Sequence, residues 1–360
     1  MANAKEMELQ YPLGEQLPTS GQALEVAPGV RWVRMGLPFA LDHINLWLLR
    51  DRDEQGQEGW AVVDCGITNE ATRSAWESVF DQHLDDLPVL RVIVTHMHPD
   101  HMGLAHWLCE KWSRPGQPCR LWISATDWNA ARMASQSTIG QGGAAAAEFF
   151  CSHGLVDPAA LEKVEQRTSY YASMVPQVPN NYRRLLDGQI LSIGAHEWRC
   201  ISGYGHSPEH ISLYSPSLGI LISGDMVLPR ISTNVSVIDL EPEANPLALY
   251  LDSLGRYEDL DNSTLVLPSH GRPFKGLHRR IEQLREHHRD RLADTLKTCQ
   301  KAPACAADLL TVLFRPNLDL HQTTFAMGEA VAHLHALWQQ GVLVRQQDAA
   351  GVWRFSPAQA

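Results

Sequence analysis

Three histidines and an aspartate lie within residues 96–101, and their spacing is the strongest chemical signal in the chain. His96, His98, Asp100 and His101 directly follow a mostly β-branched run at residues 89–94. Such a run predicts a buried strand, so the four side chains fall on the loop at its end. Imidazole nitrogen and carboxylate oxygen are ligands that Zn²⁺ and similar ions accept. The alternative is a solvated histidine-rich loop, since a chain with 17 histidines will cluster some of them by chance. Chance clustering would not produce this specific order of histidines and aspartate after a strand.

Three later strand ends carry ligands of the same kind. His206 lies in a glycine-containing turn between two strand-like runs, Asp225 ends an apolar run, and His270 follows another. Because each polar residue terminates a predicted strand, a pair of sheets could gather all of them along one rim. With the four residues at 96–101 they make seven candidate ligands, which is enough for two metal ions.

The ordered set His-x-His-x-Asp-His, His, Asp, His resembles the motifs of metallo-β-lactamase-fold hydrolases over roughly residues 20–290. The resemblance implies an α/β (α+β) fold, an αββα sandwich with a binuclear centre between its sheets. It also implies the ligand sets, which are His96, His98 and His206 for one ion, Asp100, His101 and His270 for the other, and Asp225 as the bridge.

The chain departs from many class B β-lactamases at the bridging position. Those enzymes use a cysteine where this chain has Asp225, so the pattern points away from antibiotic hydrolysis. It is more similar to glyoxalase II-like thioesterases, lactonases and RNA-processing members of the same fold.

Four further residues have candidate roles around the ions. Asp64 ends an earlier strand and is expected to accept a hydrogen bond from a ligand histidine, although an aspartate near a glycine is also ordinary turn chemistry. His210 is expected to support the ligands without binding metal. Tyr204 could donate a hydrogen bond to an oxyanion or simply pack. Arg230 could reach an anionic substrate group or lie on the surface, and His43 has no assigned role.

The ligand types define the expected chemistry. Two divalent ions, with Zn²⁺ as the default and Fe or Mn also acceptable, would share a water and lower its pKa towards roughly 7. The resulting metal-bridging hydroxide would attack a carbonyl or phosphoryl centre that one ion polarises. Asp100 would orient the hydroxide and carry its proton to the leaving group.

Composition predicts a globular enzyme without a membrane span. The 360 residues are 44% hydrophobic and 20% charged, and they contain no signal-like start and no apolar stretch of about 18 residues. Seven scattered cysteines without a Cys-x-x-Cys pair favour reduced thiols and a cytoplasmic location. The net charge of -11 disfavours nucleic acid and leaves a small-molecule acyl substrate as the expected partner.

The predicted catalytic domain covers residues 20–295. Strands at 23–50, helices at about 68–84 and 103–113 and a strand at 120–124 form its first half, and helices at about 244–259 and 275–299 belong to the second. Residues 126–186 interrupt this order with a helical insertion. It is interpreted as a lid, with a spacer as the alternative, and its aromatic residues would suit an apolar acyl group.

Residues 296–360 form a predicted second domain. Helices at 306–313 and 325–340 precede strands at 341–345 and 352–355, an order that resembles the winged-helix tail of some hydrolases of this fold. The second helix lacks the basic side chains of a DNA reader. The tail is therefore interpreted as structural, bordering the pocket or forming a homo-oligomer contact.

Three functions compete on these grounds. Hydrolysis of a thioester, ester or lactone is favoured by the ligand set, the acidic charge and the aromatic lid. A metal-dependent endoribonuclease would use the same ions and would explain the winged helix. A nucleic-acid-binding regulator with a degenerate enzyme domain is weakened because every ligand position is filled.

Overall fold

Two β-sheets pack face to face at the centre of the molecule. The computed structural model describes residues 5–138, 140 and 142–358. One sheet has seven strands in the order β1 (Ala23–Ala27), β2 (Val30–Gly36), β3 (His43–Arg52), β4 (Glu58–Val63), β5 (Val89–Ile93), β6 (Arg120–Ile123) and β7 (Tyr182–Arg184). The other has five in the order β12 (Leu265–Pro268), β11 (Ile220–Gly224), β10 (His210–Ser215), β9 (His196–Gly203) and β8 (Ile190–Ile193).

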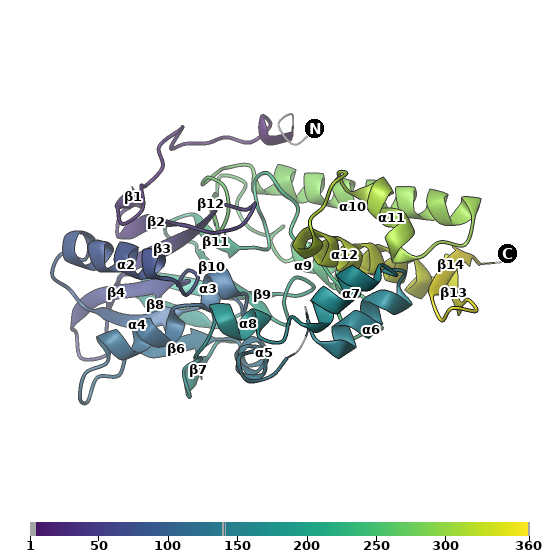
Figure 1. Ribbon diagram of the computed structural model, residues 1–360. Coiled ribbons are helices and arrows are strands. Elements are labelled where there is room, and N and C mark those ends of the chain that lie inside the picture. The colour runs from purple at the N-terminus through teal and green to yellow at the C-terminus, as the bar shows by residue number, and fades with distance from the viewer. Residues whose placement is uncertain (1–4, 139, 141, 359–360) are drawn as a thin grey trace.

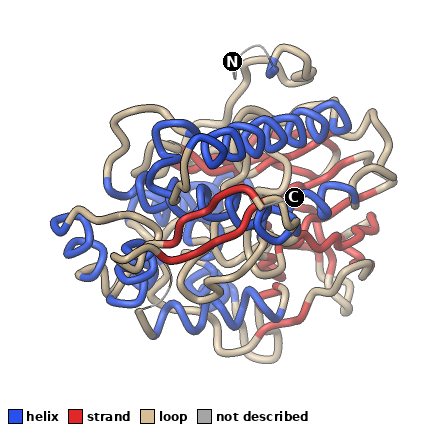
Figure 2. The backbone as a smooth tube through the Cα atoms, turned by 90° about the vertical axis from the view of Figure 1, so that its right-hand side faces the viewer, coloured by secondary structure: helices blue, strands red, loops and turns tan. Residues whose placement is uncertain are grey.

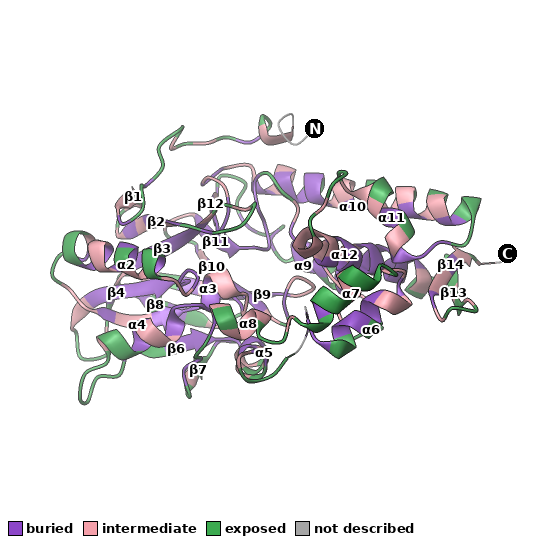
Figure 3. Ribbon diagram, in the orientation of Figure 1, coloured by how far each residue is buried: buried purple, intermediate pink, exposed green. Residues whose placement is uncertain are grey.

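Large apolar side chains fill the space between the sheets. Trp32 and Trp47 stack with their ring centroids 6.1 Å apart, and Trp198 of β9 lies in the same buried cluster. Strands β4 to β7 are parallel, and so are β11 and β12, as in sheets covered on both faces, and the central strands β4 and β11 are largely apolar and buried. Figure 3 shows these strands as the most buried part of the molecule.

Helices cover the outer face of each sheet, which confirms the αββα sandwich. Helices α2 (Glu70–His83) and α4 (Ala105–Trp112) share a core with the seven-stranded sheet. Helices α9 (Pro246–Gly255), α10 (Leu277–Lys301) and α12 (Leu320–Gln339) share one with the five-stranded sheet. Figure 1 shows the two helical groups on opposite sides of the strands.

The segment between the two halves is more integrated than a simple insertion. It contains α5 (Ala125–Gln136), α6 (Ala144–Ser152), α7 (Pro158–Glu165) and α8 (Tyr170–Met174). Strand β7 ends the segment and adds an edge to the first sheet, which the helical prediction for 126–186 did not include. Phe149 and Phe150 of α6 and Val164 of α7 join the core that contains α12, so these helices pack towards the C-terminal region.

The C-terminal region has the predicted order of two helices and a hairpin. Helix α11 (Ala306–Leu313) precedes α12, and strands β13 (Leu343–Gln347) and β14 (Trp353–Pro357) pair antiparallel. Helix α12 begins five residues before the predicted start at 325, because Asp319 and Gln322 form a capping box there. Helix α10 runs unbroken through the predicted boundary at 295/296 and packs against the hairpin (Figure 2).

Within the described ranges, no helix combines the length and apolar character needed to cross a membrane. All seven cysteines are free thiols, and Cys151 is the one that is not buried.

Candidate metal centre

The seven candidate ligands meet at one rim of the sandwich. The loop after β5 leads into the short helix α3 (Pro99–Met102), and the other three ligands follow β9, β11 and β12. Parallel pairing of β11 with β12 carries Asp225 and His270 to the same edge. The strand ends therefore position all seven side chains, listed as His96, His98, Asp100, His101, His206, Asp225 and His270.

The first group consists of three histidines whose nitrogens point at a common centre. Nε2 of His96 lies 2.9 Å from Nδ1 of His98, which lies 3.1 Å from Nε2 of His206. The third side of the triangle, from His206 to His96, is 3.2 Å. A tetrahedral ion with bonds of about 2.1 Å needs ligand atoms about 3.4 Å apart, so the triangle has the right size.

The second group combines two histidines and a carboxylate. Oδ2 of Asp100 lies 3.4 Å from Nε2 of His270 and 3.7 Å from Nε2 of His101. The three atoms lie within 4.8 Å of one another, close enough to hold one ion together. The short helix α3 presents Asp100 and His101 on neighbouring positions of its first turn.

Asp225 stands between the two groups and faces both. Its Oδ2 lies 3.3 Å from Nε2 of His206, whereas its Oδ1 lies 3.6 Å from Nε2 of His101 and 3.4 Å from Nε2 of His270. Oδ1 of Asp225 and Nε2 of His101 are buried without a hydrogen-bond partner among the described residues. Buried polar atoms are normally satisfied, so this orphaned pair fits a cation that both atoms would bind.

The opposite nitrogens of three ligands are held by hydrogen bonds. Nδ1 of His101 lies 2.8 Å from Asp64, and Nδ1 of His206 and of His270 lie 2.7 Å from the carbonyl oxygens of Asn234 and His43. Nδ1–H donates a hydrogen bond to the carbonyl or carboxylate there, which leaves the Nε2 lone pair directed into the site. His43 thus has a positioning role that its sequence context did not reveal, since its backbone makes the contact.

His210 supports the turn that carries Asp225. The backbone NH of Asp225 donates to Nε2 of His210 over 3.1 Å. Gly224 precedes it with a φ of +53°, and a Cβ there would lie 2.1 Å from the same nitrogen. The histidine and the glycine together fix the direction in which the Asp225 carboxylate points.

Asp127 of α5 connects two ligand loops, and its role was missed by sequence reasoning. Its Oδ1 accepts the NH of Met97 over 2.7 Å, and its Oδ2 accepts the NH of Glu209 over 2.6 Å. Ser124 caps α5, so the sequence signal at this position is that of an ordinary helix start. Burial raises the pKa of Asp127 to about 6, although these donors act the other way.

Charge is unevenly distributed across the two groups. Burial and neighbouring imidazoles hold the pKa of His96 well below its usual range, and burial lowers the pKa of His98 to about 3. Burial opposes charge at His270 as well, but Asp225 and Asp100 raise its pKa to about 10. Metal binding requires neutral imidazoles, so the His96 group is ready for an ion, whereas an ion at the second group would displace the proton of His270.

Two other predicted residues lie apart from these groups. The ring of Tyr204 lies under the guanidinium of Arg256 at 5.4 Å, against α9. Arg230 is exposed, and its guanidinium lies 4.0 Å from Glu6. Within residues 5–138, 140 and 142–358, no contact links either side chain to the seven ligands, so their roles towards substrate stay predictions.

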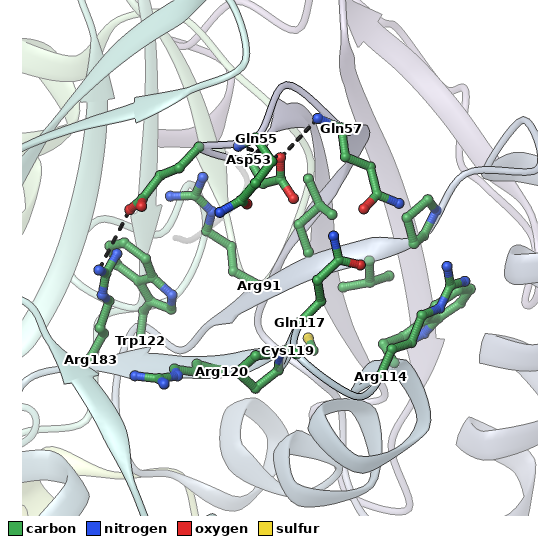
Figure 4. A pocket seen from close by; sticks show the side chains of 17 residues that line it. Asp53, Gln55, Gln57, Arg91, Arg114, Gln117, Cys119, Arg120, Trp122 and Arg183 are labelled. Carbon is green, nitrogen blue, oxygen red and sulfur yellow. Dashed lines mark hydrogen bonds and ion pairs between the residues drawn. The ribbon is translucent and has the colours of Figure 1, made fainter.

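A separate pocket of about 330 Å³ lies at the far end of the first sheet. Figure 4 shows Trp122 at one side of the pocket beside Arg183, and the guanidinium groups of Arg91 and Arg183 lie 4.8 and 4.9 Å from its ring. Both arginines are paired with acids, Arg91 with buried Asp51 and Arg183 with Glu54. The pocket contains none of the candidate ligands and is distinct from the metal centre.

Comparisons with known proteins agree with this geometry. A family model described as the metallo-beta-lactamase superfamily matches residues 41–270, a range that includes all seven candidate ligands. A second model, described as the metallo-beta-lactamase-like C-terminal domain, matches residues 292–358.

The chain is also similar to individual proteins over most of its length. It is 25% identical over 312 residues to the probable metallo-hydrolase YqjP of Bacillus subtilis strain 168, covering 85% of this chain and 91% of that protein. A crystal structure of a beta-lactamase domain protein from Burkholderia ambifaria matches with 56% identity and a TM-score of 0.93, covering 99% of this chain and all of the other. A metallo-beta-lactamase family protein from Thermus thermophilus matches with 27% identity and a TM-score of 0.73, covering 92% of this chain and 100% of that one.

Proposed function

The chain belongs to the metallo-beta-lactamase superfamily, and from this premise we propose that it is a binuclear metal-dependent hydrolase of thioesters, esters or lactones. The observation that carries the proposal is the position of Asp225. Its two oxygens face different ligand groups, at 3.3 Å from His206 on one side and 3.4 Å from His270 on the other. A carboxylate with this arrangement would hold an ion of each ligand group, and Asp225 would then supply the shared ligand of a binuclear site.

Zn²⁺ is the expected metal, and Fe or Mn ions suit the same nitrogen and oxygen donors. Bound divalent ions supply Lewis acidity and lower the pKa of water, which makes a nucleophile available near neutral pH. The remaining chemistry belongs to the side chains of the site.

Asp100 is the proposed proton carrier. Its Oδ2 is directed at His270, and its side chain is 18% exposed, so the carboxylate borders both the ligands and the space open to substrate. It is therefore placed to accept a proton from the attacking water and deliver it to the leaving group. During this proton transfer, the hydrogen bonds from His101 to Asp64 and from His206 to Asn234 fix the orientation of the two ligand rings.

The acyl class is favoured over phosphodiesters by two features. The net charge of -11 disfavours a polyanionic substrate. Aromatic side chains beside the centre, described below, suit an apolar acyl group.

Metal content and turnover test the proposal together. The purified chain should bind about two zinc ions by elemental analysis, and His98→Ala or His270→Ala should each lower this number. His106→Ala on α4, outside the ligand groups, is the matched control.

The zinc-loaded protein should then hydrolyse members of a thioester, ester and lactone panel, and chelation should abolish this activity. Turnover of single-stranded RNA alone would overturn the acyl assignment. One ion per chain in the fully active protein would overturn the binuclear site.

A further inference from the structure

Three rings gather around the ring of His321, and the four residues come from three distant parts of the chain. The His321 ring lies 5.8 Å from Phe39 with the planes 12° apart, 5.8 Å from Tyr170, and 4.9 Å from Phe325. Phe39 belongs to the loop between β2 and β3, Tyr170 begins α8, and the other two lie on α12. We call these four residues the aromatic cap.

Each part of the cap is attached to a different part of the metal centre. Helix α8 packs against α3, which carries Asp100, and the hydroxyl of Tyr171 donates to the carbonyl of Met97 between two ligand histidines (Figure 1). Burial and the nearby Asp100 carboxylate raise the pKa of Tyr170 to about 12, although Arg167 acts the other way. The α8 part of the cap therefore borders the second ligand group.

The other two parts reach the remaining ligands. The loop that carries Phe39 ends at His43, whose ring lies 6.0 Å from that of His270. On α12, the carbonyl of Phe325 accepts from Ser236 over 3.5 Å, and Ser236 also donates to the side chain of Asn234, whose carbonyl orients His206. The elements that carry the cap are thus linked to the centre on the sides of both His270 and His206.

Two polar atoms of the cap bond to each other, and the rings offer apolar surface for a ligand. Tyr170 and His321 share a hydrogen bond of 3.2 Å between the hydroxyl and Nδ1. Burial and Arg167 lower the pKa of His321, so its ring is neutral at pH 7. Phe39 remains 37% exposed even though its ring is stacked on His321. An exposed ring, stacked on its neighbour and carried by a loop that leads to the metal centre, is a surface that an apolar group would cover.

We propose that the aromatic cap is the acyl-binding wall of this hydrolase and that Phe39 and His321 make it select substrates with bulky apolar acyl groups. The inference rests on the proposed function, and it assigns the C-terminal region a direct part in substrate choice through α12. Phe39 and His321 determine specificity and take no part in the bond cleavage itself.

The test compares two thioesters that differ only in the acyl chain, acetyl and hexanoyl N-acetylcysteamine, with the zinc-loaded full chain. Phe39→Ala and His321→Ala should each lower kcat/KM for the hexanoyl substrate by about ten-fold or more, because each buried methylene contributes about 0.8 kcal/mol. Values for the acetyl substrate should stay within about three-fold. His106→Ala on α4, whose side chain pairs with Glu110 and lies outside the cap, is the control and should behave as the parent.

Equal losses on both substrates, or none on either, would overturn the selective wall. If the parent protein hydrolyses neither thioester, the proposed function fails on this panel. A binding experiment then tests the acyl-binding wall separately. Calorimetric titration with hexanoate and acetate should then still show a preference for hexanoate that Phe39→Ala removes. Equal binding of the two acids by the parent would overturn the wall.

Discussion

At the scale of single residues, the centre depends on side chains that would never touch a metal ion. Asp127 is the clearest, because one buried carboxylate accepts backbone NH groups from both the 96–101 loop and the turn that carries His206. These two loops provide the three histidines of the first group. Residues that orient ligands in this way commonly change metal affinity or activity by about 10–100-fold when they are replaced.

Asp127→Asn should therefore weaken zinc binding by about 10–100-fold while the chain stays folded. The asparagine keeps the shape but replaces one acceptor oxygen with a donor that faces an NH. Competition with a chromophoric chelator measures the affinity, and circular dichroism confirms the fold. Asp81→Asn, an exposed aspartate on α2, is the matched control. Unchanged affinity in folded Asp127→Asn would show that the two loops hold their positions without it.

At the scale of elements, the end of β11 is the tightest point of the centre. Gly224 has a φ of +53°, and a Cβ on it would meet the His210 ring at 2.1 Å. Gly188 offers a matched comparison, since its φ is +71° but nothing lies within 4 Å of its Cβ position. The two positions separate the cost of the backbone conformation from the cost of the clash.

Gly188→Ala should lower the free energy of unfolding by about 1–2 kcal/mol, the cost of a left-handed alanine. Gly224→Ala should cost about 3 kcal/mol or more and also weaken zinc binding, because Asp225 must move with the turn. Urea denaturation and zinc titration measure both effects. Similar stability losses for the two variants would mean that His210 shifts aside easily.

Strand ends explain how much of the centre the sequence could predict. Each ligand follows an apolar run, so the types and order of His96 to His270 were readable from the sequence together with the sandwich fold. The carbonyl groups of Asn234 and His43, which orient two ligand histidines, could not be predicted, because backbone carbonyls carry no sequence signal. The convergence of Phe39, Tyr170 and His321 was also unreadable, since it depends on how α8 and α12 pack in three dimensions.

Helix α12 also contributes a carboxylate beside the centre. Oε2 of Glu329 accepts from the side chain of Asn234 at 3.4 Å. Burial raises the pKa of Glu329 from 4.5 to about 7, although that hydrogen bond acts the other way. Between pH 4.5 and 7 the unfolded chain therefore loses this proton while the folded chain keeps it, so stability falls as the pH rises through that window.

Glu329→Gln removes the titration and keeps an acceptor for Asn234. The free energy of unfolding of the variant minus that of the parent should be about 1–3 kcal/mol larger at pH 8 than at pH 4.5. Urea denaturation across this range measures the difference, with Glu148→Gln on the exposed face of α6 as the control. A stability difference that does not change with pH would contradict the raised pKa.

At the scale of the whole molecule, the C-terminal region and the second half of the sandwich share one core. Buried residues of α12, such as Met327 and Val331, lie in the same cluster as Leu221 of β11 and Val266 of β12. Helix α10 runs through both parts without a break. We therefore expect the chain to unfold in a single transition, in which the metal centre and the tail are lost together.

Met327→Ala tests this coupling at a core residue of α12 that is not a candidate metal ligand. The Met327 side chain is completely buried, so its truncation should lower the free energy of unfolding by about 2–5 kcal/mol. Because the core is shared, the midpoint of zinc release on heating should fall together with the midpoint of helix loss by circular dichroism. Val312→Ala on α11, where the side chain is 39% exposed, should leave both midpoints nearly unchanged. Two separate transitions, with zinc release at its original temperature, would show that the sandwich is stable without the region that carries half of the aromatic cap.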